Sequence, residues 1–202
     1  MGMPWPKRNF KKGFTLVELM VTISIFVILT GVVIFNEGKF NSTILLTNLG
    51  YDVALTVRQA QTYGINVKEY GDNKFLPYGV HFDKINAPKS FILFADVKNT
   101  DNDKTAHPYD ISATLSTCEV VYGCVSRYNI QRGNYISDLK VDGNSVSSLD
   151  VVFQRPNPDA IITSGGNATP LGAKAEIFLI SSDGTGSTTI SVQSNGLIQV
   201  GK

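Results

Sequence analysis

The most constraining feature of the sequence is an uninterrupted apolar run near the N-terminus, residues 14–35 (FTLVELMVTISIFVILTGVVIF). The run has 22 residues, and a single one of them, Glu18, is charged. A helix of this length spans about 33 Å at 1.5 Å per residue, slightly more than a bilayer core of about 30 Å. Because backbone polar groups in lipid must be satisfied internally, the run predicts a membrane-spanning helix.

Positive charge is concentrated ahead of this run. Residues 1–13 contain no acidic residue and four basic ones: Lys7, Arg8, Lys11 and Lys12. The whole chain has 18 basic and 17 acidic residues, whereas from residue 14 onward 14 basic residues face 17 acidic ones, a net charge of −3. Cations before a span hold that end in the cytoplasm and send the C-terminal part across the membrane.

Two ordinary explanations account for the run less well. A cleaved secretory signal has an apolar core of about 7–15 residues followed by an A-x-A-like site. Here the run is longer, and Asn36-Glu37-Gly38 follows it. An ordinary single-pass anchor explains the apolar residues and the lysines but leaves Glu18 without a reason.

Glu18 needs a partner because a carboxylate inside a spanning helix costs about 2.5–3.5 kcal/mol at the centre and less near an end. If the chain were cut after Gly13, the α-amine of Phe14 would be a cation at the same depth in a neighbouring copy. Glu18 could then pair with that amine between axially staggered helices, which would also give assembly a polarity. The alternative is that Glu18 reaches the interface from the helix end.

The ten residues Lys11-Lys12-Gly13-Phe14-Thr15-Leu16-Val17-Glu18-Leu19-Met20 resemble the prepilin peptidase motif of type IV pilins and type II secretion pseudopilins. The resemblance implies that a membrane aspartyl peptidase cuts between Gly13 and Phe14 and N-methylates Phe14. It also matches Glu18 to the acidic residue at the fifth mature position. One departure is that no proline occurs between Phe14 and Leu76, where many members have a helix-kinking one.

An amphipathic helix is predicted to continue the apolar one. Its apolar residues recur at spacings of three and four, which is typical of a helix with one buried face: Leu46, Leu49, Val53, Val57 and Ala60. Gly64 is a plausible stop. We therefore divide the chain into a leader (1–13), a spanning helix (14–35), its amphipathic continuation (36–64) and an exported β-rich domain (65–202).

From about residue 75 the apolar period becomes that of β-strands. The candidate strands are rich in Val, Ile, Phe and Tyr: Tyr78–Phe82, Phe91–Val97, Val120–Tyr128, Tyr135–Val141, Leu149–Phe153, Ala175–Ile180, Thr188–Gln193 and Leu197–Val200. Asp142-Gly143 and Asn195-Gly196 are strong turn signals. The predicted fold class is α+β, a pilin-like long helix packed on an antiparallel β-domain. The ending from Ala175 to Val200 resembles the terminal β-hairpin of the minor pseudopilins of type II secretion, although strand–turn–strand endings are common in β-proteins.

Cys118 and Cys124 are the two cysteines of the chain. An exported domain permits a disulfide between them, and two free buried thiols are the alternative. With two cysteines and His81 and His107, the chain matches no zinc-finger spacing.

Asp96, Asp101 and Asp103 lie in an oxygen-rich stretch that could supply calcium ligands. The stretch lacks the EF-hand glycine and glutamate, so an exposed turn rich in Asx residues is the default interpretation and no cofactor is expected.

No catalytic motif is present, so we do not expect an enzyme. Basic residues of the β-domain are scattered among acidic ones, which gives a nucleic-acid role no support. We expect specificity to reside in loops 98–110 and 154–174.

The leading hypothesis is a structural pilin or pseudopilin subunit, of the minor, tip-initiating kind. It would be a single-pass inner-membrane protein with its C-terminal domain exported, later incorporated into a pilus or pseudopilus. Its partners would be the prepilin peptidase, an inner-membrane assembly platform and other pilins. The motif does not separate adhesion, DNA-uptake and secretion filaments. The alternative is a membrane-tethered module that binds DNA, a surface or an exported protein.

Overall fold

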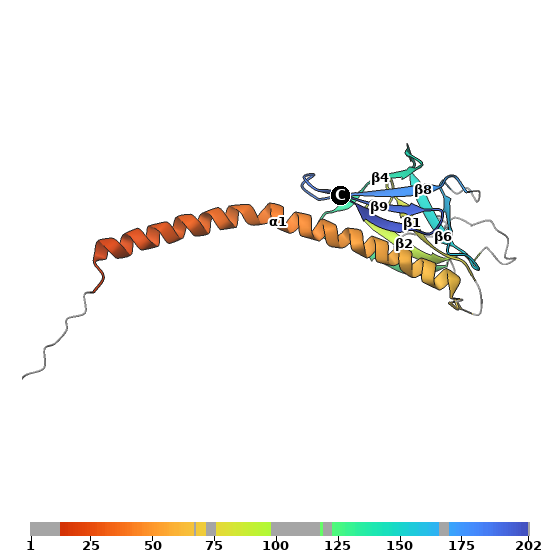
Figure 1. Cartoon of the computed structure of the whole chain (residues 1–202), viewed down its shortest axis with the longest axis horizontal. Coiled ribbons are helices and arrows are strands. Elements are labelled where there is room, and N and C mark those ends of the chain that lie inside the picture. The colour runs from red at the N-terminus through yellow and green to blue at the C-terminus, as the bar shows by residue number, and fades with distance from the viewer. Residues whose placement is uncertain are drawn as a thin grey trace, which may run out of the picture. The chain divides into compact units, whose positions relative to one another are not determined.

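The computed structural model describes residues 13–66, 68–71, 76–97, 118, 123–165 and 170–201. Helix α1 (Leu16–Ile65) is followed by β-strands, which confirms the α+β class (Figure 1). The chain forms two compact units that divide between Phe40 and Asn41. We call residues 1–40 unit 1 and residues 41–202 unit 2. The helix ends one residue beyond the expected stop at Gly64.

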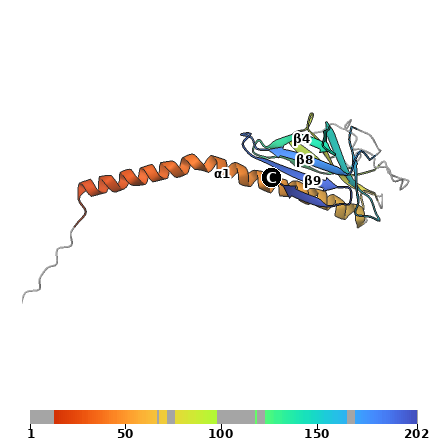
Figure 2. The same ribbon diagram turned by 45° about the horizontal axis from the view of Figure 1, so that its top comes forward.

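The described part of unit 2 contains ten strands in two antiparallel sheets. In chain order they are β1 (Tyr78–Asp83), β2 (Ser90–Ala95), β3 (Cys124–Asn129), β4 (Tyr135–Val141), β5 (Asn144–Ser145), β6 (Ser148–Phe153), β7 (Ala160–Thr163), β8 (Lys174–Ile180), β9 (Ser187–Gln193) and β10 (Ile198–Gly201). The first sheet has the order β3-β2-β1-β6-β7, and the second has the order β10-β9-β8-β4-β5. Figure 2 shows β4, β8 and β9 of the second sheet side by side.

Several strand predictions need correction. The strand expected over Phe91–Val97 is Ser90–Ala95, and the one expected from Val120 is described only from Cys124, since residues 119–122 lie outside the described part. Strands β5 and β7 were not predicted at all. Strand β7 falls within residues 154–174, which we expected to be a loop. It has four residues and follows two prolines, so its local sequence carries little strand signal.

The amphipathic stripe predicted on the helix is confirmed. Val53, Val57 and Ala60 are fully buried and join one core with apolar residues from both sheets. Leu46 is also buried, and Leu49 is half-buried against the same core. The second half of α1 therefore closes the apolar interior of unit 2 through the face that the periodicity indicated.

Two glycines allow the helix to lie close to each sheet. A Cβ added at Gly50 would lie 3.1 Å from the Thr188 side chain and 3.3 Å from that of Val200. A Cβ added at Gly64 would overlap the carbonyl of Phe153 in the other sheet. A larger residue at either position would force the helix or its neighbours to shift. Both positions therefore favour glycine because the helix packs closely there, and not because it bends.

Gln61 fixes the same helix to two loops. Its buried side-chain amide donates from Nε2 to the carbonyls of Pro158 at 3.0 Å and Gly196 at 3.1 Å. The amide oxygen accepts a 2.7 Å hydrogen bond from Arg58. Gln61 is not part of the apolar stripe of the helix, and the structure shows that it is nevertheless a buried tether between the helix and these loops.

Both predicted turns occur where glycine is needed. Asp142 and Gly143 have φ of 48° and 85°, and they connect β4 to β5 with Val141 opposite Asn144. Positive φ at both central residues is the requirement of the two-residue hairpin. Gly196, with φ of 81°, lies between β9 and β10.

Candidate assembly site on the N-terminal helix

The helix begins with a side-chain cap. Gly13, Phe14 and Thr15 precede its first residue, Leu16. The hydroxyl of Thr15 accepts a 3.2 Å hydrogen bond from the backbone N–H of Glu18, and its carbonyl accepts one from Leu19 at 3.1 Å. These are the contacts of an N-cap residue, and Thr15-x-x-Glu18 has the spacing of a capping box. The sequence therefore contains a local signal for the start of the helix. Our prediction of that start used only the apolar run and did not use this signal.

The Glu18 carboxylate has no hydrogen-bond or ion-pair partner within the described residues. It lies in the first turn of the helix, where an acidic side chain is favoured by the orientation of the peptide dipoles. The cap uses only the backbone N–H of Glu18 and leaves its side chain available. Phe14, four residues earlier, is 81% exposed. The site therefore presents an unpaired carboxylate four residues after Phe14, the residue whose amine cleavage after Gly13 would free.

The hydroxyl groups of the apolar segment are satisfied within the helix. Thr22, Ser24 and Thr30 donate to the carbonyls of Leu19, Met20 and Phe26 at 2.9, 2.8 and 2.7 Å. A hydroxyl that donates to a carbonyl three or four residues earlier has its hydrogen-bond donor satisfied within the helix. They make Glu18 the one side chain between Leu16 and Ile34 with a polar group left over.

The remaining surface of this segment is apolar on all sides. Residues Leu16–Ile34 form a helix long and apolar enough to cross a membrane, and none of it is buried within the protein. A helix that is apolar all round requires a membrane or other helices to cover it.

Residues 8–34 match the family model of the prokaryotic N-terminal methylation motif. The chain carries a prepilin-like N-terminus. The methylation motif is the hallmark of type IV pilin and pseudopilin prepilin-like proteins. It implies processing by a prepilin peptidase and assembly with other pilins, and it fits a membrane-anchored protein with an exported domain. No curated protein and no solved structure matches the chain.

The methylation motif and the candidate span end at the same residue, Ile34. The match includes Gly13, Phe14, Thr15 and Glu18. Cleavage after Gly13, methylation of Phe14 and pairing of Glu18 stay predictions at the level of single residues.

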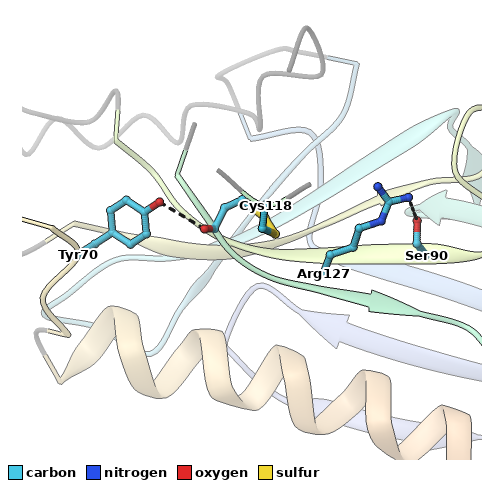
Figure 3. The surroundings of a disulfide bond; sticks show 5 residues. Tyr70, Ser90, Cys118 and Arg127 are labelled. Atoms are coloured by element: carbon cyan, nitrogen blue, oxygen red, sulfur yellow. Dashed lines mark hydrogen bonds between the residues drawn. A yellow bond between two sulfur atoms is a disulfide. The ribbon is translucent and has the colours of Figure 1, made fainter. Parts of the chain in front are cut away.

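The cysteines form a disulfide, as predicted. Cys118 and Cys124 are joined with their Cα atoms 5.0 Å apart, within the usual range for such a bond. Figure 3 shows the bond at the start of β3, where the Tyr70 hydroxyl donates to the carbonyl of Cys124 at 3.3 Å. The Tyr70 hydrogen bond and the disulfide therefore both fix the start of β3, which is an edge strand. Further along β3, Arg127 donates to the Ser90 hydroxyl at 3.0 Å.

The calcium hypothesis gains no support. Asp101 and Asp103 lie outside the described residues, and Asp96 is buried just after β2, where its backbone N–H donates to Pro77 at 2.8 Å. Among the residues that the structure describes, no three or more His, Cys, Asp or Glu side chains are grouped to hold a metal ion.

A buried ion pair in the first sheet was not foreseen. His81 lies on β1 with its Nδ1 2.7 Å from Oδ1 of Asp150 on β6. Burial opposes the charged imidazolium, but the Asp150 carboxylate outweighs it, so the pKa of His81 is raised. The two residues are 69 positions apart and directly opposite in the strand register, which no local pattern reveals.

Proposed function

We propose that this protein is a structural subunit of a type IV pilus or a type II secretion-like filament, of the minor pilin or pseudopilin kind. A prepilin peptidase removes residues 1–13 and methylates Phe14. The mature helix then leaves the membrane as it joins other pilin helices at an inner-membrane assembly platform. Unit 2 is exported and lies on the outside of the filament.

The observation that supports this proposal is the unpartnered carboxylate of Glu18 on an otherwise apolar helix. In lipid such a group costs about 2.5–3.5 kcal/mol at the centre and less near a helix end, where Glu18 lies. The Phe14 amine of a neighbouring copy would offset this cost, since a charge-assisted N–H···O bond is about twice as strong as a neutral one. The capped first turn holds Glu18 in the helix while Phe14 remains outside it, so the two groups project from different levels of the same end.

Intact mass and N-terminal sequencing of the membrane-extracted protein test this proposal. The full chain is produced in a host that has a prepilin peptidase, and the expected product begins at N-methylated Phe14. In a Gly13→Val variant we expect the leader to be retained, because the branched side chain obstructs the backbone at the cut.

The matched control is Gly31→Val, at a glycine with open space around its Cα. We expect this variant to be processed normally. A wild-type protein that retains residues 1–13 would overturn the proposal and favour a membrane-tethered binding module instead.

A further inference from the structure

A groove of about 430 Å³ lies on unit 2 between helix α1 and the first sheet. We call it the α1–β3 groove. It is lined by five helix residues, one residue of β2 and two of β3: Leu49, Asp52, Leu55, Thr56, Gln59, Phe91, Tyr128 and Asn129. Strand β3 is the edge of its sheet, and Figure 3 shows α1 running alongside it.

The walls of the groove are held in place by their own contacts. The rings of Phe91 and Tyr128 stack with centroids 5.1 Å apart and planes inclined by 12°. The Tyr128 hydroxyl donates to Oε1 of Gln59 at 3.3 Å, and Nε2 of Gln59 donates to the Tyr63 hydroxyl at 2.7 Å. A partner would therefore meet a preformed surface and would not have to order it.

The groove combines apolar and aromatic side chains with neutral polar ones (Thr56, Gln59 and Asn129) and one negative charge. Leu55 is 65% exposed at its rim, and Tyr51, one turn earlier on the same helix face, is 56% exposed. Asp52 is the one charged residue of the lining, and its carboxylate has no hydrogen-bond or ion-pair partner among the described residues. Such a groove fits an apolar side chain that has a cation nearby.

The turn between β1 and β2 of the same chain carries an exposed apolar side chain and, close to it in the sequence, a cation. Ile85 is 65% exposed in this turn, and Lys89, four residues later, is exposed and without an ion pair in the described structure. The turn is rigid because the Asp83 carboxylate accepts hydrogen bonds from the backbone N–H groups of Ile85 and Asn86, both at 2.8 Å. The Asn86 side chain adds a third at 2.8 Å.

We propose that the β1–β2 turn of a second copy inserts Ile85 into the α1–β3 groove and places Lys89 beside Asp52. Both surfaces are preformed, and the contact would remove the exposed Ile85 side chain from water, which favours association. The turn and the groove share no residue, so one copy can offer both, and a contact between unlike surfaces can repeat along a filament. This inference rests on the proposed function, because it names a contact between filament subunits.

The test links two variants of the full chain, each with one added cysteine, co-expressed with different tags. One copy carries Leu55→Cys and the other Ile85→Cys, and membranes are treated with a short bis-maleimide. The reagent reacts with thiols and leaves the Cys118–Cys124 disulfide intact. We expect a covalent dimer that contains both tags, and little dimer from either variant alone. The control replaces Ile85→Cys with Leu197→Cys, at a residue 42% exposed in the β9–β10 turn.

Charge reversal gives an independent measurement. Asp52→Lys or Lys89→Asp alone should lower cross-linking several-fold, and a mixture of Asp52→Lys with Lys89→Asp copies should restore it. The proposed contact is overturned if no dimer containing both tags forms. It is also overturned if the Leu197→Cys control is cross-linked as strongly as Ile85→Cys. If substitutions in the groove impair assembly but no copy is linked to Ile85→Cys, the occupant of the groove is not a second copy of this chain. That result overturns the proposal and indicates a different subunit. The N-terminal mass of the same sample reports separately on the proposed function.

Discussion

Nε2 of Gln61 lies 3.1 Å from the carbonyl oxygen of Gly196, across 135 positions of the chain, and donates a hydrogen bond to it. The same nitrogen donates to Pro158. One helix side chain therefore fixes the turn between β9 and β10 and the loop before β7. Both bonds require an amide nitrogen, which leads to a direct test.

Gln61→Glu should lower the free energy of unfolding by about 2–3 kcal/mol, because a carboxylate would face two buried carbonyls without a proton to donate. Denaturant unfolding of unit 2 within the full chain in detergent measures the effect. The matched control is Gln131→Glu, where the amide is exposed and its loss should change stability by less than about 0.5 kcal/mol. Equal effects at both positions would contradict the tether.

Thr15→Ala should destabilise the first turn of α1 by about 1 kcal/mol, because the N–H of Glu18 loses its acceptor. Hydrogen exchange at the Glu18 amide should then be about fivefold faster. Thr22→Ala is the control, since its hydroxyl donates to a carbonyl and caps no N–H. An unchanged exchange rate in Thr15→Ala would show that the cap contributes nothing.

Glu18→Ala should leave cleavage and methylation intact but reduce filament incorporation about tenfold or more, a loss equivalent to about 1.4 kcal/mol per contact. The physical reason is that the Phe14 amine of the neighbour loses its anion. Sheared-filament yield measures incorporation, and mass spectrometry of the N-terminus measures processing. Glu176→Ala, in an exposed pair with Lys174, serves as the control. Normal incorporation of Glu18→Ala would count strongly against the pairing.

The His81–Asp150 pair should make stability depend on pH. The pKa of His81 is raised above its usual value of 6.5 in the folded protein, so folding favours the protonated form. The resulting contribution is complete below pH 6.5 and is lost as the pH rises through the raised pKa. Asp150→Asn should remove this dependence and cost about 3 kcal/mol on the acidic side. Unfolding curves from pH 5.5 upward test it, and a wild-type profile that rises with pH across this window would contradict the assignment.

Local patterns predicted the helix and the turns because their causes are local. The 22-residue apolar run and the spacing of Val53, Val57 and Ala60 specify a helix and its buried face through the 3.6-residue period. Asp142-Gly143 specifies a hairpin through positive φ. Strand β7 was missed because four residues after two prolines form a strand only when β6 is available to pair with them.

The sequence by itself determined the membrane-competent helix, the position of Glu18 in it, the buried face of its second half and the prepilin-like motif. Each depends on residues within a few turns of one another, where composition and spacing fix the backbone. The tertiary structure alone decided the order of the strands, the His81–Asp150 pair, the Gln61 tether and the α1–β3 groove. These join residues tens of positions apart, and their geometry follows from how two sheets and a helix close around one core.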